Sequence, residues 1–522
     1  MTQSPQQSPA PKPPRRWIGP AILLLSALAV VLLGLLAVSI LERRWESQRP
    51  QVVVQPLAQW EGDNAVWGRN YPREYESYAR TRIENTRTKF GGSYQRDYLQ
   101  ADPRQVILFA GYPFSIDYKQ ARGHWWAVND VSQTHRVKKP FQAGTCWTCK
   151  STDVPRLMAT MGTAEFYAAN FHDLAKDIQH PIGCQDCHDP ATLNLRITRP
   201  ALLEALGVLE APPFTPAPRG EPATQPAGGA AATQPPAATT SAQAPPSQSD
   251  SSRFAVEGLY HGRFTHQEMR SLVCAQCHVE YYFRPQPKNY LAFPWKKGTT
   301  VEAIIEYYDE YDFTDWKHPI SGTPILKAQH PDYELYTTGV HAYRGVACAD
   351  CHMPYRSEGG VKFTDHHVQS PLLNIANSCS VCHRWSEQEI RTRVEAIQTK
   401  VYNAKLAAED ALVPAHLDLA AAVQARVSEA DLAGPRKMLR GAQFRWDFIS
   451  ANNGMGFHSP QESMRVLGDA ANQAQQVRVA VARLLAAKGI SAQPAYPDIS
   501  TREQAAAIAQ SFVEGKAPRL LP

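Results

Sequence analysis

Cysteines at one fixed spacing are the residues of this chain whose pattern predicts chemistry most directly. All ten fall into five Cys-x-x-Cys pairs, which are Cys146 and Cys149, Cys184 and Cys187, Cys274 and Cys277, Cys348 and Cys351, and Cys379 and Cys382. Histidine follows four of the pairs, as in c-type haem attachment, where two thioethers hold the porphyrin and the adjacent imidazole ligates the iron. Structural zinc and redox or disulfide pairs are alternatives, but neither requires that histidine. The repetition therefore predicts covalent haem.

The first pair differs from the others because it reads CWTCK, with Lys150 in place of the histidine. An amine would then bind one side of that iron, and an unoccupied opposite side would be free to bind a substrate. The alternatives are a motif that has lost its haem, or a haem that only transfers electrons with lysine as ligand. Since both attachment cysteines remain, the pattern favours a haem with an open coordination position.

Histidines supply the remaining axial ligands of such haems. The four that follow the pairs are His188, His278, His352 and His383. A haem that only transfers electrons usually needs a second strong axial ligand, so four more histidines are required. The candidates in distinctive local sequences are His124, His341, His458 and one of His366 and His367.

The elements that must position these residues are predicted to be mainly α-helical, with little β-structure and with haems forming much of the core. Apolar residues at helical spacing predict long helices around residues 390–401 and 467–484. Their apolar stripes could pack on the haem-binding body or on a second subunit. The sequence does not separate these two options.

The N-terminal region contains a run of 25 residues, 17–41, without an ionisable side chain, and Lys12, Arg15 and Arg16 precede it. As a helix it would be roughly 37 Å long, enough to cross a membrane. We interpret it as a retained anchor, although an uncleaved or cleaved export signal is the alternative. Residues 1–16 would then be a cytoplasmic tail. Because c-type haem is attached outside the bacterial cytoplasmic membrane, the rest of the chain should lie on the periplasmic side.

The remaining chain is predicted to form two parts, and the first of them contains an insert. Residues 42–459 should form a catalytic domain with five haems, and residues 460–522 a helical region and possible dimer interface. Residues 211–252 are rich in Pro, Ala, Thr, Gln and Ser, which predicts a disordered insert. The formal charge is only +5, so nucleic acid is not indicated as a partner.

The order of one CxxCK and four CxxCH units resembles the ammonia-forming pentahaem cytochrome c nitrite reductases (the cytochrome c-552 family). The strings AGYPFSIDY, RGHWWAV, CHVEYYF, KAQHPDYE, CHMP and FTDH carry the resemblance from about residue 60 to residue 460. The insert is not part of the common family pattern. An N-terminal anchor would also distinguish this chain from the many soluble members.

The resemblance implies a ligand for each iron. Lys150 would be the proximal ligand of the active-site haem. The other four irons would be held by His188 with His366, His278 with His124, His352 with His458, and His383 with His341. The TDH string aligns His366 rather than His367 as the ligand.

The resemblance also implies the catalytic residues and a calcium site. Arg136, Tyr281 and His330 would surround the open iron, with Arg136 and a protonated His330 attracting the anionic substrate and His330 and Tyr281 donating protons. One Ca²⁺ would be held by the side chains of Glu280 and Gln329 and the backbone carbonyls of Tyr281 and Lys327, which are the oxygen ligands this ion prefers.

The implied activity is the six-electron reduction of nitrite to ammonium, with hydroxylamine and nitric oxide as further substrates. The expected cofactors are five covalent haem c groups and one Ca²⁺. The expected partners are a membrane quinol-oxidising cytochrome as electron donor and a second copy of the chain in a homodimer. The alternative function is a membrane-anchored multihaem electron carrier without a substrate site of its own. A hydroxylamine oxidase would be expected to carry more haem motifs.

Overall fold

The computed structural model describes residues 17–47, 53–83, 85–212 and 262–522. The chain divides into two compact units, residues 1–55 and 56–522. The predicted cytoplasmic tail and nearly all of the predicted insert at 211–252 lie outside the described residues.

The first unit is described by one helix, α1 (Ile18–Ser47). Its apolar segment, Ile18–Glu42, has a mean hydropathy of 3.0 and is exposed along its whole length. By length and composition it could cross a membrane, and a signal sequence would satisfy the same criteria. The predicted apolar N-terminal helix is therefore present. Its assignment as a membrane anchor rather than an export signal stays a prediction.

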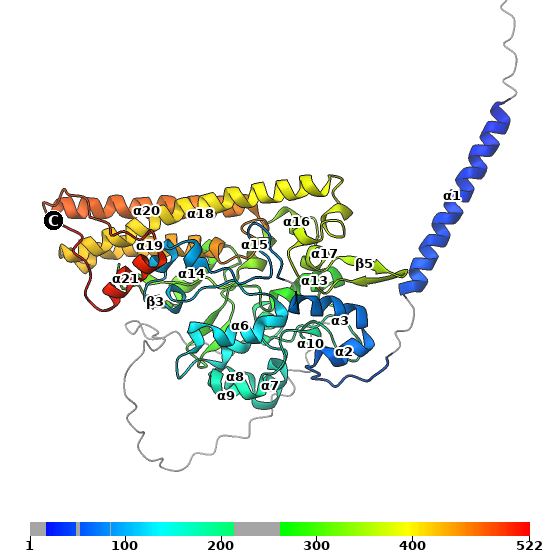
Figure 1. The fold of residues 1–522 in the computed structure, drawn as a ribbon, viewed down its shortest axis with the longest axis horizontal. Coiled ribbons are helices and arrows are strands. Elements are labelled where there is room, and N and C mark those ends of the chain that lie inside the picture. The colour runs from blue at the N-terminus through cyan, green and yellow to red at the C-terminus, as the bar shows by residue number, and fades with distance from the viewer. Residues whose placement is uncertain (1–16, 48–52, 84, 213–261) are drawn as a thin grey trace, which may run out of the picture. The chain divides into compact units, whose positions relative to one another are not determined.

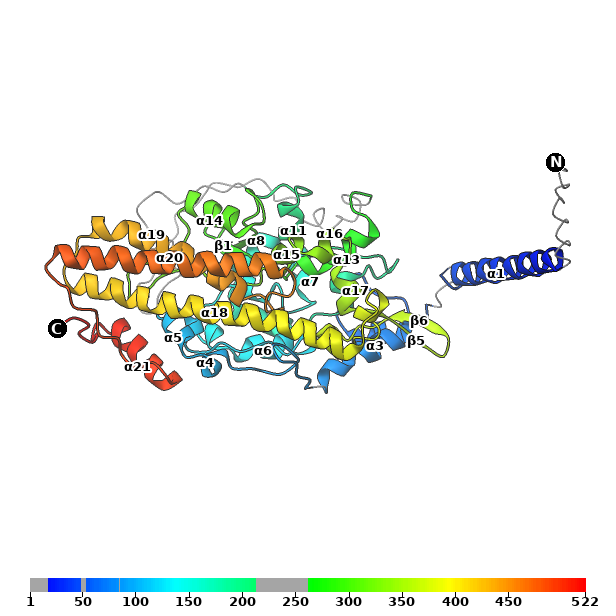
Figure 2. The same ribbon diagram turned by 90° about the horizontal axis from the view of Figure 1, so that it is seen from above.

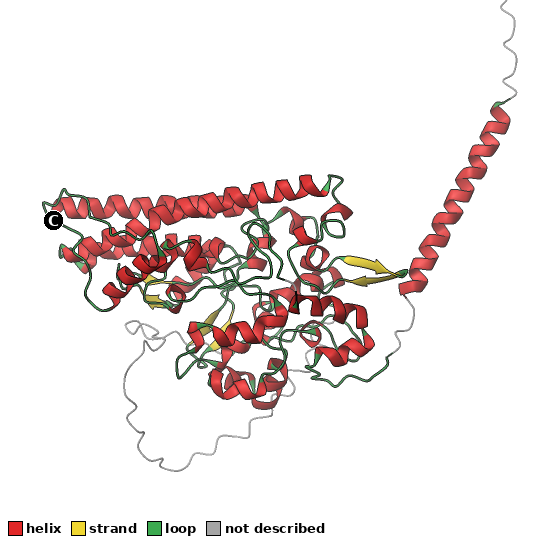
Figure 3. Cartoon of the chain, in the orientation of Figure 1, coloured by secondary structure: helices red, strands yellow, loops and turns green. Residues whose placement is uncertain are grey.

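The second unit is mainly α-helical, which confirms the predicted fold class (Figure 3). The strands that are described form three two-stranded antiparallel sheets. They are β1 (Tyr282–Arg284) with β2 (Tyr290–Ala292), β3 (Trp316–Lys317) with β4 (Pro324–Ile325), and β5 (Tyr355–Glu358) with β6 (Val361–Thr364).

Most helices before residue 380 are short. They are α2 (Asn64–Asn70), α3 (Pro72–Ala79), α4 (Tyr98–Ala101), α5 (Arg104–Leu108), α6 (Ala127–Gln133), α7 (Val154–Met161), α8 (Thr163–Ala168), α9 (Phe171–Leu174), α10 (Cys184–Cys187), α11 (Pro200–Ala205), α13 (His266–Ala275), α14 (Val301–Glu310), α15 (Asp332–Thr337), α16 (Val340–Tyr343) and α17 (Cys348–His352). The 3₁₀ turns are η1 (Arg80–Arg82), η2 (Pro113–Ser115), η3 (His124–Trp126), η4 (His135–Val137), η5 (Gly144–Trp147), η6 (Ala175–Asp177), η8 (Pro371–Leu373) and η9 (Cys379–Val381).

Three long helices of this unit pack side by side (Figures 1 and 2). They are α18 (Glu387–Gln424), α19 (Glu429–Ser450) and α20 (Pro460–Ala487), and α21 (Arg502–Val513) packs against α5. The two predicted long helices fall within α18 and α20, whereas α19 was not predicted.

The apolar stripe of α18 changes its partners along the helix. Near the start, Ile390 and Val394 join a small core cluster that includes Leu372 and Ile375, next to the last Cys-x-x-Cys pair. Farther along, Val401 belongs to the main core, which the three long helices share with the segment around α5. The stripe therefore packs on the haem-motif body at one end and within the helical bundle at the other.

Side-chain caps fix where helices begin beside the haem motifs. Before α13, the Thr265 amide donates to Glu268 Oε2 at 2.7 Å and the Glu268 amide donates to Thr265 Oγ1 at 3.2 Å. Ser386 and Glu389 form the same reciprocal pair at the start of α18. Each box satisfies two amides that a helix start leaves without intrahelical partners. These boxes hold in place the helix that carries Cys274 and the helix that follows the last motif.

A second core surrounds the CWTCK segment. Trp147 stacks on Phe171 with ring centroids 4.0 Å apart, and its indole Nε1–H donates to the Phe171 carbonyl at 3.0 Å. Tyr167 packs edge-on against Tyr290 in the same core. The buried indole fixes the turn that presents the neighbouring cysteines and Lys150.

Candidate functional site

Each Cys-x-x-Cys pair lies within or next to a single helical turn. The first cysteines of the five pairs lie, in chain order, in η5, α10, α13, α17 and η9. Residues three apart on one turn are close neighbours, so the two thiols of a pair can both reach one porphyrin. In α10 and α17 the aspartate between the cysteines caps its own turn, because Asp186 accepts from the Gly183 amide and Asp350 from the Ala347 amide, both at 2.8 Å.

Contacts between cysteines of different pairs show how the motifs are arranged. The first pair lies near the third, and the third near the fourth, because the side chains of Cys149 and Cys277 interact, as do those of Cys274 and Cys348. Electrostatic interactions also join the second pair to the third and the fourth to the fifth; they are Cys187–Cys274 and Cys351–Cys379. The motifs therefore form a series of neighbours, with the third near the first, second and fourth.

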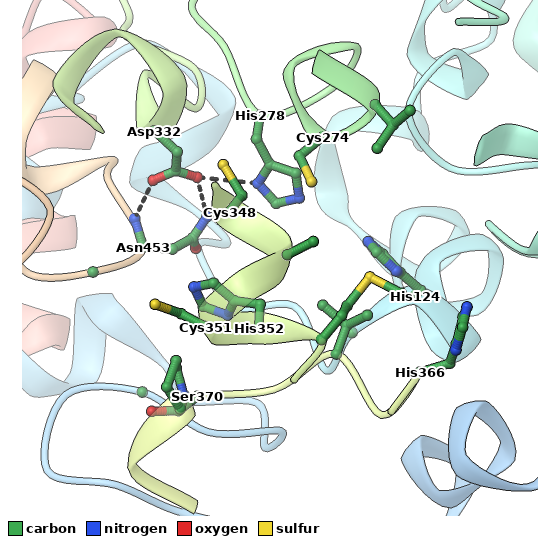
Figure 4. Close-up of a pocket in the computed structure, with 18 of the residues that line it drawn as sticks. His124, Cys274, His278, Asp332, Cys348, Cys351, His352, His366, Ser370 and Asn453 are labelled. Atoms are coloured by element: carbon green, nitrogen blue, oxygen red, sulfur yellow. Dashed lines mark hydrogen bonds and ion pairs between the residues drawn. The ribbon is translucent and has the colours of Figure 1, made fainter. Parts of the chain in front are cut away.

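Eight histidines face one another in four pairs at nearly equal separations. The ring centroids are 6.3 Å apart in His124–His278, His341–His383 and His352–His458, and 6.2 Å apart in His188–His366. Figure 4 shows His278 and His352 on neighbouring motifs, with His124 and His366 reaching in from other segments. Two imidazole rings on opposite sides of one metal ion, each nitrogen about 2 Å from it, would be separated by roughly this distance. These are the four pairs that the resemblance implied.

A cavity of about 1630 Å³ contains all eight of these histidines, Lys150 and nine of the ten cysteines in its lining. Burial lowers the pKa of His124, His188 and His352 to about 4, so these rings are neutral at pH 7 and can act as ligands. The paired neutral imidazoles, the paired thiols and the volume between them fit haem groups. We therefore treat the cavity as the candidate haem site.

Three of the predicted active-site residues, Lys150, Arg136 and His330, line the same cavity. Tyr281 lies beside it and interacts electrostatically with Cys149, Cys146 and Arg136. The structure thus brings together the residues predicted around the open iron.

The positive charge expected on His330 is not supported by its surroundings. Burial lowers the pKa of His330 to about 3. A neutral imidazole at pH 7 can still donate its N–H, but it does not attract an anion by charge. Of the two predicted cations this leaves Arg136, whose guanidinium lies 4.4 Å from the centroid of the Phe114 ring.

The predicted calcium ligands are close together. The fully buried Glu280 accepts at Oε2 from the Gln329 amide at 2.6 Å and at Oε1 from the Tyr308 hydroxyl at 2.9 Å. The Gln329 side-chain amide reaches the Lys327 carbonyl at 3.2 Å. Burial, with the charges of Glu334 and Asp315 adding to it, raises the pKa of Glu280 well above its usual range. A buried carboxyl among carbonyl and amide oxygens fits a hard cation, which would stabilise the ionised form.

Two residues that lie at this site in the structure were not predicted from the sequence to have a role there. Phe114 stacks under Arg136, and Asp332 accepts a hydrogen bond from His278. Both lie inside strings that carried the resemblance, AGYPFSIDY and KAQHPDYE. Their membership in those strings was the available signal, but their contacts depend on packing between distant segments.

Comparison of this sequence with known proteins finds relatives that belong to one family. The sequence profile of the family described as cytochrome c552 matches residues 63–225 and 253–518. A cytochrome c-552 from Porphyromonas gingivalis is 42% identical over 499 residues, covering 94% of this chain and 90% of that protein. One from Desulfotalea psychrophila is 38% identical over 503 residues, covering 93% and 87%.

A solved structure is also similar to this chain. It is the catalytic subunit of cytochrome c nitrite reductase from Desulfovibrio desulfuricans, described as having two calcium sites. The TM-score is 0.68 at 28% sequence identity, over 82% of this chain and 88% of that one.

Proposed function

The chain belongs to the cytochrome c552 family, and on that premise we propose that it reduces nitrite to ammonium at a haem whose proximal ligand is Lys150. The observation that carries the proposal is that Lys150, Arg136 and His330 line the same cavity as four facing histidine pairs. Four irons with two imidazole ligands would transfer electrons, and the fifth would bind the substrate. The similarity to a solved nitrite reductase supports this assignment.

Nitrite reduction to ammonium takes six electrons and eight protons, which no single haem can store. Bound haem supplies the electrons and the coordination position for the substrate nitrogen. The chain contributes the arrangement of its motifs, and the interactions of Cys149 with Cys277 and of Cys274 with Cys348 support a series of the first, third and fourth motifs. We infer that five haems form a continuous path toward the first motif.

The residues around the first motif would bind the anion and protonate it. Arg136 would hold a nitrite oxygen by charge-assisted hydrogen bonds and polarise the N–O bond. Tyr281 would donate a proton to the departing oxygen, because burial raises its pKa well above the usual range and keeps it a phenol. The neutral His330 would act as an N–H donor rather than as a second cation.

Calcium held by Glu280, Gln329 and the carbonyls of Tyr281 and Lys327 would connect β1 to the segment that carries His330. We expect Glu280→Gln to weaken calcium binding by about 10- to 100-fold, because the substitution removes the only anionic ligand of this set. The measurement is the ratio of calcium to haem after dialysis against a chelator. Glu302→Gln is the matched control, since Glu302 forms an exposed ion pair with Arg465. Equal calcium retention by both variants would contradict the site.

The cellular setting follows from α1 and from haem attachment. We propose that α1 anchors the protein on the periplasmic side of the cytoplasmic membrane and that a quinol-oxidising membrane cytochrome donates the electrons. We also propose a homodimer with the late helices at its interface. Hydroxylamine and nitric oxide are expected as further substrates, because each is less reduced than ammonium.

The proposed function is tested with the purified holoprotein and a reduced viologen dye. We expect ammonium in a one-to-one ratio to consumed nitrite and a high-spin ferric signal that changes when nitrite is added. Absence of ammonium, together with electron paramagnetic resonance spectra of five six-coordinate haems, would instead identify an electron carrier.

A further inference from the structure

Asp332 connects two parts of the proposed electron path. It is buried at the start of α15, and its Oδ2 accepts from His278 Nδ1 at 3.1 Å. The Asn453 amide donates to Asp332 Oδ1 at 2.8 Å, and the Asn453 side-chain amide donates to Oδ2 at 2.7 Å. Figure 4 shows the carboxylate between the imidazole and the asparagine. Asn453 belongs to the loop that carries His458, so one carboxylate contacts both the third motif and the loop that serves the fourth.

This contact differs from those of the corresponding histidines in other motifs. His188 Nδ1 bonds the Leu193 carbonyl at 2.9 Å, and His352 Nδ1 bonds the Gln369 carbonyl at 2.9 Å. Among the four histidines that follow a cysteine pair, and within the part of the chain that the structure describes, only His278 hydrogen-bonds a carboxylate. Among the described residues, the other three motif histidines thus hydrogen-bond a neutral backbone carbonyl or have no such acceptor. His278 instead hydrogen-bonds a carboxylate with a full negative charge.

The charge of the acceptor changes what the imidazole gives to the iron. A carboxylate at Nδ1 draws the ring proton toward itself and makes the other nitrogen a stronger electron donor. A stronger donor and a buried negative charge both stabilise ferric over ferrous iron, so the reduction potential falls. A backbone carbonyl has the same effect to a smaller degree, because it carries only a partial charge.

We propose that Asp332 tunes the haem of the third motif to a lower reduction potential than a carbonyl acceptor would give. The inference rests on the proposed function, since it assumes haem iron between His278 and His124. With haem bound, each electron that this iron would accept from a neighbouring haem would pass on to the haem of the first motif, while Asp332 would keep its charge. Because Cys277 of the third motif lies near Cys149 of the first, the lower potential would favour transfer to the catalytic haem.

The experiment is a redox titration of the holoprotein followed by optical and electron paramagnetic resonance spectra. In Asp332→Asn we expect one low-spin haem to titrate at a higher potential with shifted g values, while the other haems are unchanged. We also expect kcat to fall with KM for nitrite unchanged, because substrate binding is not altered. Asp418→Asn removes the same charge on α18, where Asp418 contacts Arg478 and Tyr496, and should leave all potentials unchanged.

Asn453→Ala gives a second test in the opposite direction. It removes the amide that donates to the same oxygen as His278, so that oxygen becomes a stronger acceptor for the imidazole and the potential should fall. This variant also tests the proposal if Asp332→Asn loads haem poorly. Unchanged potentials in both variants, or an equal shift in Asp418→Asn, would overturn it. A protein that shows these shifts but makes no ammonium would refute the proposed function and leave the role of Asp332 standing.

Discussion

Replacement of Arg136 by alanine is expected to lower kcat/KM for nitrite by about 100- to 1000-fold, the range observed when one preorganised donor to a developing charge is removed. Arg136 lines the haem cavity, and its guanidinium is held over the Phe114 ring. With His330 neutral, Arg136 is the cation available to bind the anion. Steady-state kinetics with nitrite and a reduced viologen measure the effect.

Two further variants test whether the effect of Arg136→Ala comes from the charge and shape of the guanidinium or from a structural role of Arg136. Arg136→Lys keeps the charge but loses the planar guanidinium that binds two oxygens, so an intermediate activity is expected. Lys138→Ala removes a charge from an exposed neighbour of the same turn and should leave kinetics unchanged. All three variants should retain haem absorbance. Loss of haem in Arg136→Ala would mean that Arg136 is structural.

Local features of this protein were predictable from the sequence. Haem attachment depends on residues three positions apart on one turn, so the Cys-x-x-Cys pairs are visible without knowledge of the fold. The long helices were predictable in part, because apolar spacing marked the segments of α18 and α20. The same patterns did not reveal α19, which contains Gly434 and Pro435 near its start.

Long-range features were not predictable from spacing. The sequence offered more histidines than four irons need, and the choice of His124, His341, His366 and His458 came from family resemblance. The structure brings each of them opposite one motif histidine from a distant segment, as with His366 and His188. The protonation of His330 could not be predicted either, because it depends on how deeply the folded chain buries the imidazole.

The helical bundle explains how these long-range contacts are held. Asp447 of α19 accepts from the buried Lys327 Nζ at 3.0 Å and from the Ala328 amide at 2.9 Å. Lys327 Nζ also lies 4.9 Å from the centroid of the Phe114 ring, on which Arg136 stacks. The bundle is therefore connected to the candidate calcium ligands and to Arg136 through one buried lysine.

Replacement of Tyr281 by phenylalanine is expected to lower kcat for nitrite on the order of 100- to 10,000-fold, the range for loss of a general acid. Burial raises the pKa of Tyr281 well above its usual range. The phenol therefore stays protonated between pH 6 and pH 9. Its loss should lower the rate by a similar factor across this range, which a pH series of kcat would measure.

Tyr282→Phe is the matched control, because it removes a hydroxyl from the adjacent residue. The Tyr282 hydroxyl lies 2.5 Å from the Tyr307 hydroxyl in the main core, away from the haem cavity. Turnover by this variant should be unchanged. If the wild-type rate instead fell at alkaline pH and Tyr281→Phe removed that fall, Tyr281 would be titrating in the working range, and the raised pKa that underlies its role as proton donor would be refuted.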